Sequence, residues 1–570
     1  MSNSFVTGQS REKGQYLVRG LLWVALAFLI CSIILLSLVP PVSRDELVHH
    51  LAVPKLYLSH GGMYEIPFMP FSYYPANLDL LYLVPLYFGN DIVPKHIHFF
   101  FALATAWLLF RYLKNRTNAA YALAGVLFFL SIPVVVKLSI TAYIDLGIIF
   151  FSTASLLWLL KWRESGFKNK FLVTSGVFCG LGLGTKYNGL ITLFLLTLFA
   201  ALLYARHHGG GKGILGLIKP AWHGVFFFLV SLVIFSPWMI RNYSWTKNPI
   251  YPLYDQWFNP PIRNSESPTS EGSEGEGKSA GHSIFAYRRV IYGEKGWEMA
   301  LLPLRVFVEG KDGDPRYFDG RLNPLLLLLP LLAFYGCRGD SLIIGQEKRI
   351  LIAFVLLFFA FAFFSTDLRM RYIAPIIPPL VILSVFGLRN LLSRITALQS
   401  QNIRRGGIAF VLVALVCFAG LNMHYLLSQF AYVDPLSYLG GKLDRHEYIA
   451  RFRPEYEAVQ HINQHLAKDA TVSMVFLGDR GYYLEREYVY GEDLISRFVK
   501  KANRPEDILT AFRTRGITHL FIHDNIFLKW LNFNFGKEER ERFIEFVRSC
   551  TTGVFSRNGF SVLRLTDAMP

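Results

Sequence analysis

The chain has 570 residues, of which 52% are hydrophobic and 17% charged, and its formal net charge is +17. Soluble globular proteins carry about 25% charged residues, so this composition excludes an ordinary soluble enzyme and indicates a polytopic membrane protein. The basic residues lie in short loops between apolar runs and not on one soluble face, which argues against a nucleic-acid-binding protein.

The first apolar run, residues 21–39, follows the basic residues Arg11, Lys13 and Arg19. It is long enough to span a bilayer and no small-residue cleavage site follows it, so we expect an uncleaved signal anchor with its N-terminus inside. The Lys- and Arg-rich loops farther along predict about eleven spans and an outside C-terminus. These spans are expected to begin near residues 18, 94, 119, 142, 170, 188, 219, 323, 349, 371 and 407.

The first outer loop, residues 40–93, opens with a concentration of charge. Asp45 and Glu46 stand side by side just past the first apolar run, where charge is costly unless a site is formed. The two acids are equally suited to cap a helix, because acids stabilise a helix N-terminus, and the sequence leaves both interpretations open. The apolar segments 47–60 and 77–88 are too short to span, so we expect helices lying at the outer interface.

A second long outer loop covers residues 241–322. Its part 261–283 is rich in Ser, Gly and Glu and has too little apolar surface to fold, so we expect it to be disordered. Aromatic residues on both sides of this part indicate anchoring at the membrane interface.

The composition changes near residue 430, where acidic and basic residues begin to balance. We therefore predict a transmembrane domain over residues 1–429 and a soluble, periplasmic α/β domain over residues 430–570. Within the second domain, two apolar runs predict strands and two amphipathic segments predict helices. The strands are expected at 471–477 and 518–523, and the helices at 505–515 and 538–548.

Charged residues of the spans gather at their predicted outer ends. Cations in this position are able to hold a lipid phosphate, and a carboxylate is able to take a proton from an incoming hydroxyl. Each residue also has a structural interpretation as a helix cap, a snorkelling side chain or an interface anchor, and the histidines there are expected to be wet interfacial side chains. Their shared face is what favours a site formed by Asp45, Glu46, Lys137, Asp145, Lys186, Arg369 and Arg371.

The order of these motifs resembles the GT-C-fold glycosyltransferases that use polyprenyl-phosphate donors, especially bacterial relatives of protein mannosyltransferases and lipid A aminoarabinose transferases. The resemblance covers most of the chain. It rests on Asp45-Glu46, Asp145, Gly-Thr-Lys186-Tyr-Asn-Gly, Ser236-Pro-Trp-Met-Ile-Arg-Asn242, Asn248-Pro-Ile-Tyr-Pro252, Arg371-Tyr-Ile-Ala-Pro375 and a soluble outer domain.

The resemblance implies a role for each site residue. Asp45 is the expected base, with Glu46 as its neighbour. Asp145 is the expected acid of the short outer loop between the third and fourth predicted spans, which is not the long outer loop 241–322. The expected ligands of the donor phosphate are Lys186, Arg369, Arg371 and Tyr372. Some members of the group bind a divalent metal and others do not. Here His49, His50 and the acids could form a divalent-metal site, although their spacing shows none, and the sequence leaves a metal open.

The implied function is transfer of a hexosyl or pentosyl group from a polyprenyl-phosphate donor to a periplasmic lipid, glycan or protein, at a bacterial inner membrane. Inversion at the anomeric carbon is expected, because one base and a direct displacement suffice. A lipid-linked oligosaccharide ligase or polymerase is an alternative that the sequence does not separate. A flippase or transporter is a second alternative, but it requires polar groups near the membrane midplane and paired half-repeats, neither of which is visible. A non-catalytic envelope scaffold leaves the outer charges unexplained.

Overall fold

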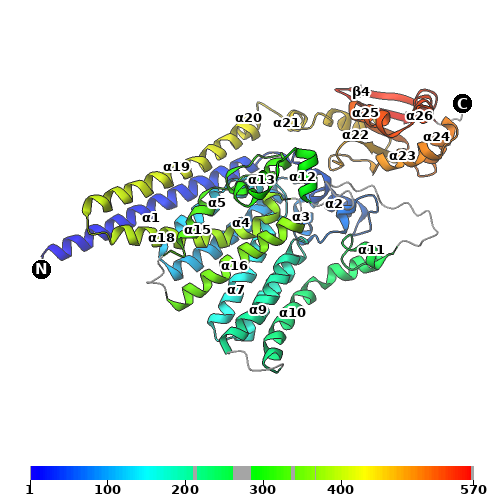
Figure 1. Ribbon diagram of the computed structural model, residues 1–570. Coiled ribbons are helices and arrows are strands. Elements are labelled where there is room, and N and C mark those ends of the chain that lie inside the picture. The colour runs from blue at the N-terminus through cyan, green and yellow to red at the C-terminus, as the bar shows by residue number, and fades with distance from the viewer. Residues whose placement is uncertain (1, 209–214, 261–283, 336–340, 366–367, 567–570) are drawn as a thin grey trace.

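The computed structural model describes residues 2–208, 215–260, 284–335, 341–365 and 368–566. Long helices lie side by side in one part of the molecule, and a smaller part with a β-sheet follows at the C-terminal end (Figure 1). The predicted disordered segment 261–283 lies outside the described residues.

Within the described residues, seven helices are long and apolar enough to cross a membrane, or up to eight if the bent pair α5 (Ala119–Ser131) and α6 (Pro133–Ser139) is one span. Four of the seven are single helices, two are parts of longer helices, and one joins three consecutive helical elements. They are α4 (Val93–Arg116), α7 (Asp145–Glu164), α9 (Gly189–His208), α19 (Gln401–Val433), the segment Tyr16–Ser37 of α1 (Ser2–Ser37), the segment Ile218–Thr246 of α10 (Leu215–Thr246), and Met370–Thr396, which contains α17 (Met370–Ile373), η4 (Ala374–Ile376) and α18 (Ile377–Thr396).

The remaining three of the eleven predicted spans coincide with helices that do not meet this criterion. α8 (Asn169–Leu183) has 15 residues and α15 (Leu325–Leu332) has 8, which is shorter than the hydrocarbon core requires. The third, α16 (Leu342–Ser365), carries Glu347 near its start. The sequence therefore placed the helices, but its count of about eleven exceeds the number of full-length apolar helices in the described part.

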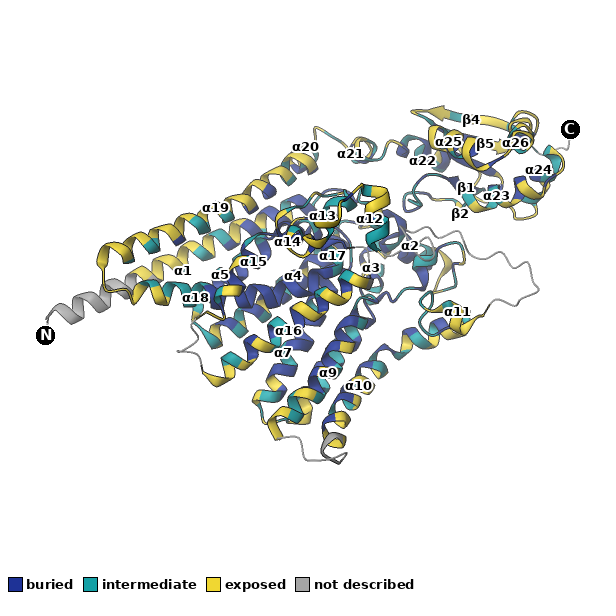
Figure 2. Ribbon diagram, viewed as in Figure 1, coloured by how far each residue is buried: buried dark blue, intermediate teal, exposed yellow. Residues whose placement is uncertain are grey.

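Burial is highest in the middle of the bundle. The share of residues that are buried in the apolar stretch of a span is 78% in α7 and 83% in the span Met370–Thr396, but only 11% in α19. Figure 2 shows the same contrast between the buried interior helices and the exposed outer faces of α1, α10 and α19. Apolar surface on those outer helices is explained by contact with lipid, so the site described below is held by the best-packed helices.

The first outer loop is structured, and both of its segments that were predicted to be helices, 47–60 and 77–88, are helical over most of their length. The first consists of a π-helical turn, η1 (Glu46–His50), followed by α2 (Ala52–His60); after the 3-10 turn η2 (Pro70–Tyr73), the second is α3 (Asn77–Tyr87). In η1, the Leu51 backbone N–H donates to the Glu46 carbonyl at 2.9 Å. Such π turns are frequent at functional sites.

The second outer loop folds into short helical pieces around the described parts of residues 241–322. They are α11 (Asp255–Phe258), α12 (Ile284–Tyr292), α13 (Gly296–Ala300), α14 (Leu302–Val308) and η3 (Pro315–Tyr317). This loop ends beside the site, because the Phe318 carbonyl accepts a hydrogen bond from the Met370 backbone N–H at 2.8 Å.

The C-terminal part contains a five-stranded sheet in the order β2-β1-β3-β5-β4. The strands β1 (Thr471–Val475), β2 (Glu487–Tyr490) and β3 (His519–His523) are parallel, whereas β4 (Thr551–Arg557) and β5 (Phe560–Leu565) form an antiparallel hairpin. The predicted strands 471–477 and 518–523 coincide with β1 and β3. The predicted helices coincide with α24 (Pro505–Arg513) and α26 (Lys537–Cys550); the other helices of this part are α20 (Pro435–Leu439), α21 (Arg445–Phe452), α22 (Tyr456–His465), α23 (Glu492–Lys501) and α25 (Asp524–Asn534).

The loop that follows β1 rests on the first outer loop. The Tyr482 backbone N–H donates to the Leu47 carbonyl at 3.1 Å, and Lys55 Nζ donates to the carbonyls of Tyr482 and Leu484 at 2.7 and 2.9 Å. The carboxyl end of β1 therefore lies over the segment that begins with the predicted catalytic acids.

Candidate active site

The structure pairs the first predicted acid with a predicted phosphate ligand. Arg371 Nη1, in α17, donates a hydrogen bond to Oδ2 of Asp45, which is the N-cap residue of η1. Burial raises the pKa of the Asp45 carboxyl, but the Arg371 guanidinium outweighs this effect and holds the pKa well below its usual range. Asp45 is therefore ionised and its charge is compensated.

The second predicted acid is paired in the same way. Asp145, the first residue of α7, is fully buried, and its Oδ1 lies 2.7 Å from Nζ of Lys186 in the turn between α8 and α9. The second carboxylate oxygen, Oδ2, is also buried and has no hydrogen-bond partner among the described residues. That oxygen is available to a ligand hydroxyl.

Tyr372 brings the predicted cations together. Its ring centroid lies 5.1 Å from Lys186 Nζ, 5.2 Å from Arg371 Cζ and 6.0 Å from Arg369 Cζ. Three of the four residues expected to bind the donor phosphate thus surround the ring of the fourth, at the point where the ion pairs Asp45–Arg371 and Asp145–Lys186 meet. Cations gathered in this way attract an anion such as a phosphate.

The turn between α8 and α9 is tightly packed where it positions Lys186. The Gly184 carbonyl accepts a hydrogen bond from the Asn77 backbone N–H at 2.8 Å. A Cβ atom at Gly184 would lie 2.2 Å from Nδ2 of Asn77, so only glycine fits this approach between the turn and α3. Gly184 therefore allows the turn and α3 to pack closely, as small residues do between helices.

Glu46 has a structural role. Its carboxylate accepts hydrogen bonds from the backbone N–H groups of Ser43 at 2.8 Å and Ala142 at 2.6 Å, and the residue is 1% exposed. It therefore ties the first outer loop to the segment that precedes Asp145. Of the two interpretations of the acid pair, capping applies to Glu46, whereas Asp45 faces the cations.

Two of the histidines expected to be wet are buried, so that prediction is wrong for them. His50 Nδ1 lies 2.9 Å from Asp79 Oδ1, and His98 Nδ1 lies 2.8 Å from the Thr141 carbonyl. His98 Nε2 accepts a hydrogen bond from the Leu146 backbone N–H at 2.8 Å, which assigns the neutral tautomer with hydrogen on Nδ1. His50 is bonded within the first outer loop, and His98 is bonded to the segment that precedes and begins α7. These contacts join separate segments of the sequence, so the sequence does not indicate that the two rings are buried.

Asp79 is a buried acid that the sequence reasoning missed. Burial raises the pKa of Asp79 to about 8 and lowers the pKa of His50 to about 4, so both groups are neutral at pH 7 and share one hydrogen bond. The electrostatic neighbours of His50 are Asp45, Asp145, Lys186 and Arg371. The sequence did contain a signal for Asp79 that was not used: it is the single acid in the apolar segment 77–88.

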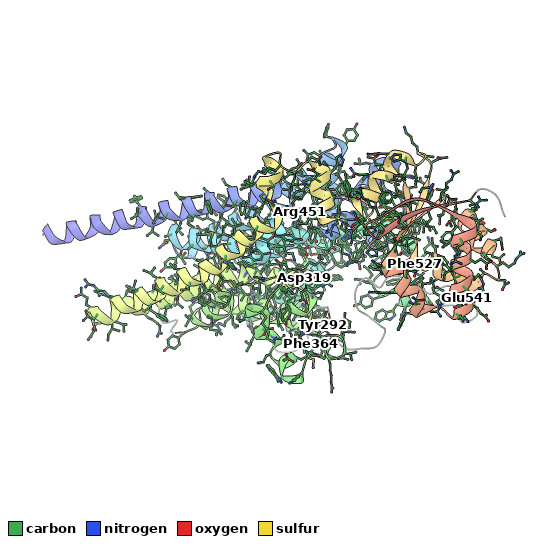
Figure 3. All side chains as sticks on the ribbon, turned by 90° about the horizontal axis from the view of Figure 1, so that it is seen from above. Tyr292, Asp319, Phe364, Arg451, Phe527 and Glu541 are labelled. Atoms are coloured by element: carbon green, nitrogen blue, oxygen red, sulfur yellow. The ribbon has the colours of Figure 1, made fainter. Side chains whose placement is uncertain are left out.

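A second charged cluster lies beside the site. Arg369 Nη1 is 3.9 Å from Oδ2 of Asp319, a residue labelled in Figure 3, and Lys137 Nζ is 2.9 Å from Oδ1 of the same carboxylate. Lys137 also lies 3.4 Å from Asp312 Oδ1. Lys137, which the sequence grouped with the site, therefore forms ion pairs with two acids of the long outer loop 241–322. These acids, Asp312 and Asp319, were not among the residues predicted from the sequence.

The donor set does not fit a divalent metal. Within the described ranges, no three His, Cys, Asp or Glu side chains come together as metal ligands. His50 and Asp79 are bonded to each other, and the His49 ring stacks on Phe71 with centroids 4.5 Å apart. No step below is therefore routed through a metal.

Comparisons with known proteins show what the fold of this chain resembles. Residues 88–240 match the family model of dolichyl-phosphate-mannose-protein mannosyltransferases. ArnT from Cupriavidus metallidurans in the apo state is 16% identical with a TM-score of 0.55, covering 96% of this chain and 98% of that one. The same protein bound to undecaprenyl phosphate is 15% identical with a TM-score of 0.54, covering 96% and 98%.

The apo oligosaccharyltransferase of Archaeoglobus fulgidus is 10% identical with a TM-score of 0.51, covering 95% of this chain and 74% of that one. No curated protein matches the sequence. The expected resemblance is thus confirmed, and the chain has a GT-C fold whose C-terminal part contains a β-sheet.

Proposed function

We propose that this membrane protein transfers a sugar from a polyprenyl-phosphate donor to an acceptor on the periplasmic side of a bacterial inner membrane. The proposal is carried by one observation: two ion pairs, Asp45–Arg371 and Asp145–Lys186, meet at the Tyr372 ring. The match to ArnT bound to undecaprenyl phosphate supports a donor of this class. The acceptor is a lipid, glycan or protein of the envelope.

In the proposed mechanism, the donor phosphate binds to Arg371 and Lys186, where the carboxylates of Asp45 and Asp145 lie in the unliganded chain. A phosphate that takes the place of Asp45 on Arg371 removes the interaction that lowers the pKa of Asp45. Asp45 therefore becomes a better base when the donor is bound. Binding of the donor and activation of the acceptor are coupled in this way.

The transfer itself is a single displacement. The acceptor hydroxyl oxygen bonds to the anomeric carbon, the bond from that carbon to the phosphate oxygen breaks, and polyprenyl phosphate leaves with the bonding electrons. The hydroxyl proton passes to Asp45. Arg371 and Lys186 stabilise the charge that develops on the leaving phosphate. The configuration at the anomeric carbon is inverted.

The unpartnered Oδ2 of Asp145 is assigned to a hydroxyl of the transferred sugar. This oxygen is buried and lacks a partner among the described residues, while Lys186 holds the other oxygen in place. A buried acceptor without a partner is costly, and a ligand hydroxyl would remove that cost. Asp145 would thus orient the donor sugar and leave proton transfer to Asp45.

The proposal is tested with the purified protein in lipid nanodiscs, supplied with a panel of polyprenyl-phosphate sugars and an extract of envelope lipids and glycans. Consumption of one donor with release of polyprenyl phosphate is the expected result. Mass spectrometry of lipids, glycans and envelope proteins from a deletion strain then identifies the acceptor by the sugar it lacks. If a folded protein consumes none of the donors, and the deletion strain lacks no sugar, the proposal fails.

A further inference from the structure

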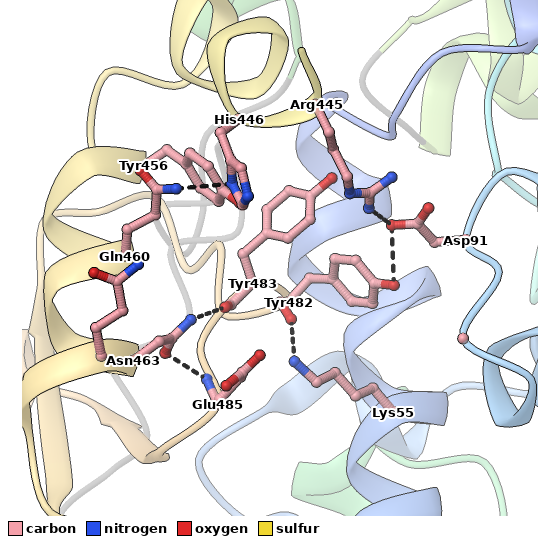
Figure 4. Close-up of a pocket in the computed structure, with 12 residues that line it drawn as sticks. Lys55, Asp91, Arg445, His446, Tyr456, Gln460, Asn463, Tyr482, Tyr483 and Glu485 are labelled. Carbon is pink, nitrogen blue, oxygen red and sulfur yellow. Dashed lines mark hydrogen bonds and ion pairs between the residues drawn. The ribbon is translucent and has the colours of Figure 1, made fainter.

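A cavity of about 370 Å³ lies where the C-terminal part rests on the first outer loop (Figure 4). Lys55 and Asp91 line it from the first outer loop, and helices α21 and α22 line it from the opposite side. Small-molecule sites typically enclose about 300–1,000 Å³, so the cavity has the size of a binding site for a small polar group. Nothing in the mechanism above uses it.

The formal charges that line this cavity balance, with Lys55 and Arg445 on one side and Asp91 and Glu485 on the other. Arg445 Nη2 donates to Asp91 Oδ2 at 2.5 Å, and the Tyr482 hydroxyl donates to the same carboxylate oxygen at 3.3 Å. Lys55 Nζ is bonded to two backbone carbonyls. An anionic ligand such as a phosphate therefore finds no excess of positive charge here, whereas three cations gather around the Tyr372 ring. The cavity favours a neutral ligand.

The groups left to a ligand are uncharged donors and acceptors beside aromatic rings, together with one carboxylate. The Gln464 amide and the Glu485 carboxylate line the cavity and have no hydrogen-bond partner within the described parts of the chain. Gln460 donates to His446 Nδ1 at 2.7 Å through Nε2, which leaves its amide oxygen as an acceptor. The Tyr482 and Tyr483 rings lie next to each other in Figure 4, with their centroids 5.0 Å apart. An amide both donates to and accepts from hydroxyl groups, an ionised carboxylate accepts from them, and aromatic faces pack against C–H surfaces.

We propose that this cavity binds a neutral, hydroxyl-rich carbohydrate portion of the acceptor, an inference that rests on the proposed transfer of sugar at Asp45. The Tyr482 N–H bond to the Leu47 carbonyl joins the cavity wall to the segment two residues beyond Asp45. A saccharide seated in the cavity thus lies next to the loop that carries the base. The acceptor class that follows is a glycan or a glycolipid, and not an unglycosylated protein.

Binding is tested on the full-length protein in nanodiscs without donor, by saturation-transfer difference NMR. The probes are glucose, galactose, mannose and N-acetylglucosamine. Gln464 is exposed at the rim of the cavity, so Gln464→Trp fills the space without disturbing the fold; Glu485→Gln is a milder second variant. Lys468→Ala, an exposed site just beyond α22 that does not line the cavity, is the matched control.

At least one probe is expected to bind, and Gln464→Trp should weaken its binding about tenfold, which corresponds to about 1.4 kcal/mol. Lys468→Ala should bind as wild type does. Absence of signal from every probe, or equal binding by Gln464→Trp and wild type, overturns the assignment. In turnover, Gln464→Trp should raise KM for the acceptor and leave kcat and the donor KM unchanged.

The same measurements separate failure of the cavity assignment from failure of the proposed function. Asp45→Asn should bind the saccharide normally, because Asp45 does not line the cavity. A protein that transfers sugar from a polyprenyl-phosphate donor but binds no probe in the cavity retains its function and loses this site. A protein that binds the probe, loses it in Gln464→Trp and consumes no donor retains the site and loses the proposed function.

Discussion

Arg371 donates a hydrogen bond to Asp45 across 326 residues of sequence, joining the start of α17 to the first outer loop. Although burial raises the pKa of Asp45, this guanidinium holds it well below its usual range, so the resting carboxylate is a weak base. Donor binding and base strength therefore depend on the same arginine. A base that becomes stronger only when the donor phosphate is present is protected from acting on an acceptor alone.

The Asp45→Asn variant should lose transfer and gain affinity for the donor lipid. Loss of a general base typically costs about 10²–10⁴-fold in rate. Asn no longer competes for Arg371 as an anion, so polyprenyl phosphate should bind more tightly than to wild type. Single-turnover kinetics and direct binding of polyprenyl phosphate to the purified variant measure the two effects. Near-normal turnover would show that another group is the base.

Glu46→Gln is the matched control for this variant, one residue along the chain. Its carboxylate accepts two backbone hydrogen bonds, from Ser43 and Ala142, and a Gln side chain retains one oxygen acceptor. We expect a modest loss of thermal stability and a much smaller loss of rate than for Asp45→Asn. A loss of rate equal to that of Asp45→Asn, with stability unchanged, would assign Glu46 to the chemistry.

Substitution of Arg371 should act on donor binding. Arg371→Ala is expected to raise KM for the donor more than it lowers kcat, because the lost interaction holds the phosphate before and during transfer. Arg371→Lys should restore little, since an ammonium group lacks the planar fork that binds a phosphate and its neighbour together. Donor titrations of both variants measure this, and wild-type donor affinity in Arg371→Ala would place the phosphate elsewhere.

Lys186 should contribute to stability as well as to donor binding. The Asp145 carboxylate is fully buried, so Lys186→Ala leaves a buried charge without its partner, which costs on the order of 3 kcal/mol. The double variant Asp145→Asn/Lys186→Ala should recover much of this stability without recovering activity. Thermal unfolding of wild type and the two variants in one detergent compares their stabilities. Equal stability of the single and double variants would contradict the importance of the pair.

The sequence predicted the helices, and the gathering of the charged site residues at one face, better than it predicted which residues contact each other in the site. Apolar runs and the Pro-Glu start of α24 were sufficient to place helices, because those signals are local. β4 was missed since most of its residues are exposed and give no buried alternation. The His50–Asp79 bond joins residues 29 apart on separate outer-loop helices, and nothing local marks such a pairing. Charge at the span ends predicted which residues gather, whereas the partner of each required the packed loops.

The buried Asp79 should make the protein less stable as the pH rises from 6.5 to 8. Its pKa is about 8 in the folded chain and near 3.8 when unfolded, so the folded state holds the extra proton and stability falls with increasing pH, by up to about 1.4 kcal/mol per pH unit. The lowered pKa values of His49 and His50, about 3 and 4, have the opposite sign but act only below pH 6.5.

Asp79→Asn keeps the hydrogen bond to His50 through its amide. This variant should lose less stability than wild type as the pH rises from 6.5 to 8. Melting temperatures at pH 6.5, 7.25 and 8 for wild type and the variant measure the difference. Asp524→Asn, in the C-terminal part, is a control that should leave the slope unchanged. Parallel pH profiles for wild type and Asp79→Asn would mean that Asp79 is ionised in the folded chain.

The C-terminal α/β part should lie on the periplasmic side. Arg404 and Arg405 stand at the start of α19, and the positive-inside rule places that end in the cytoplasm. The helix then crosses outward, and the sheet that follows packs on the outer loop that carries Asp45. Alkaline phosphatase fused after residue 570 should therefore be active, and a reporter that works only in the cytoplasm should be silent. A fusion placed after Arg116, at the inner end of α4, should give the reverse pattern. Cytoplasmic activity at the C-terminus would move the acceptor side of the proposed reaction to the cytoplasm and refute the topology.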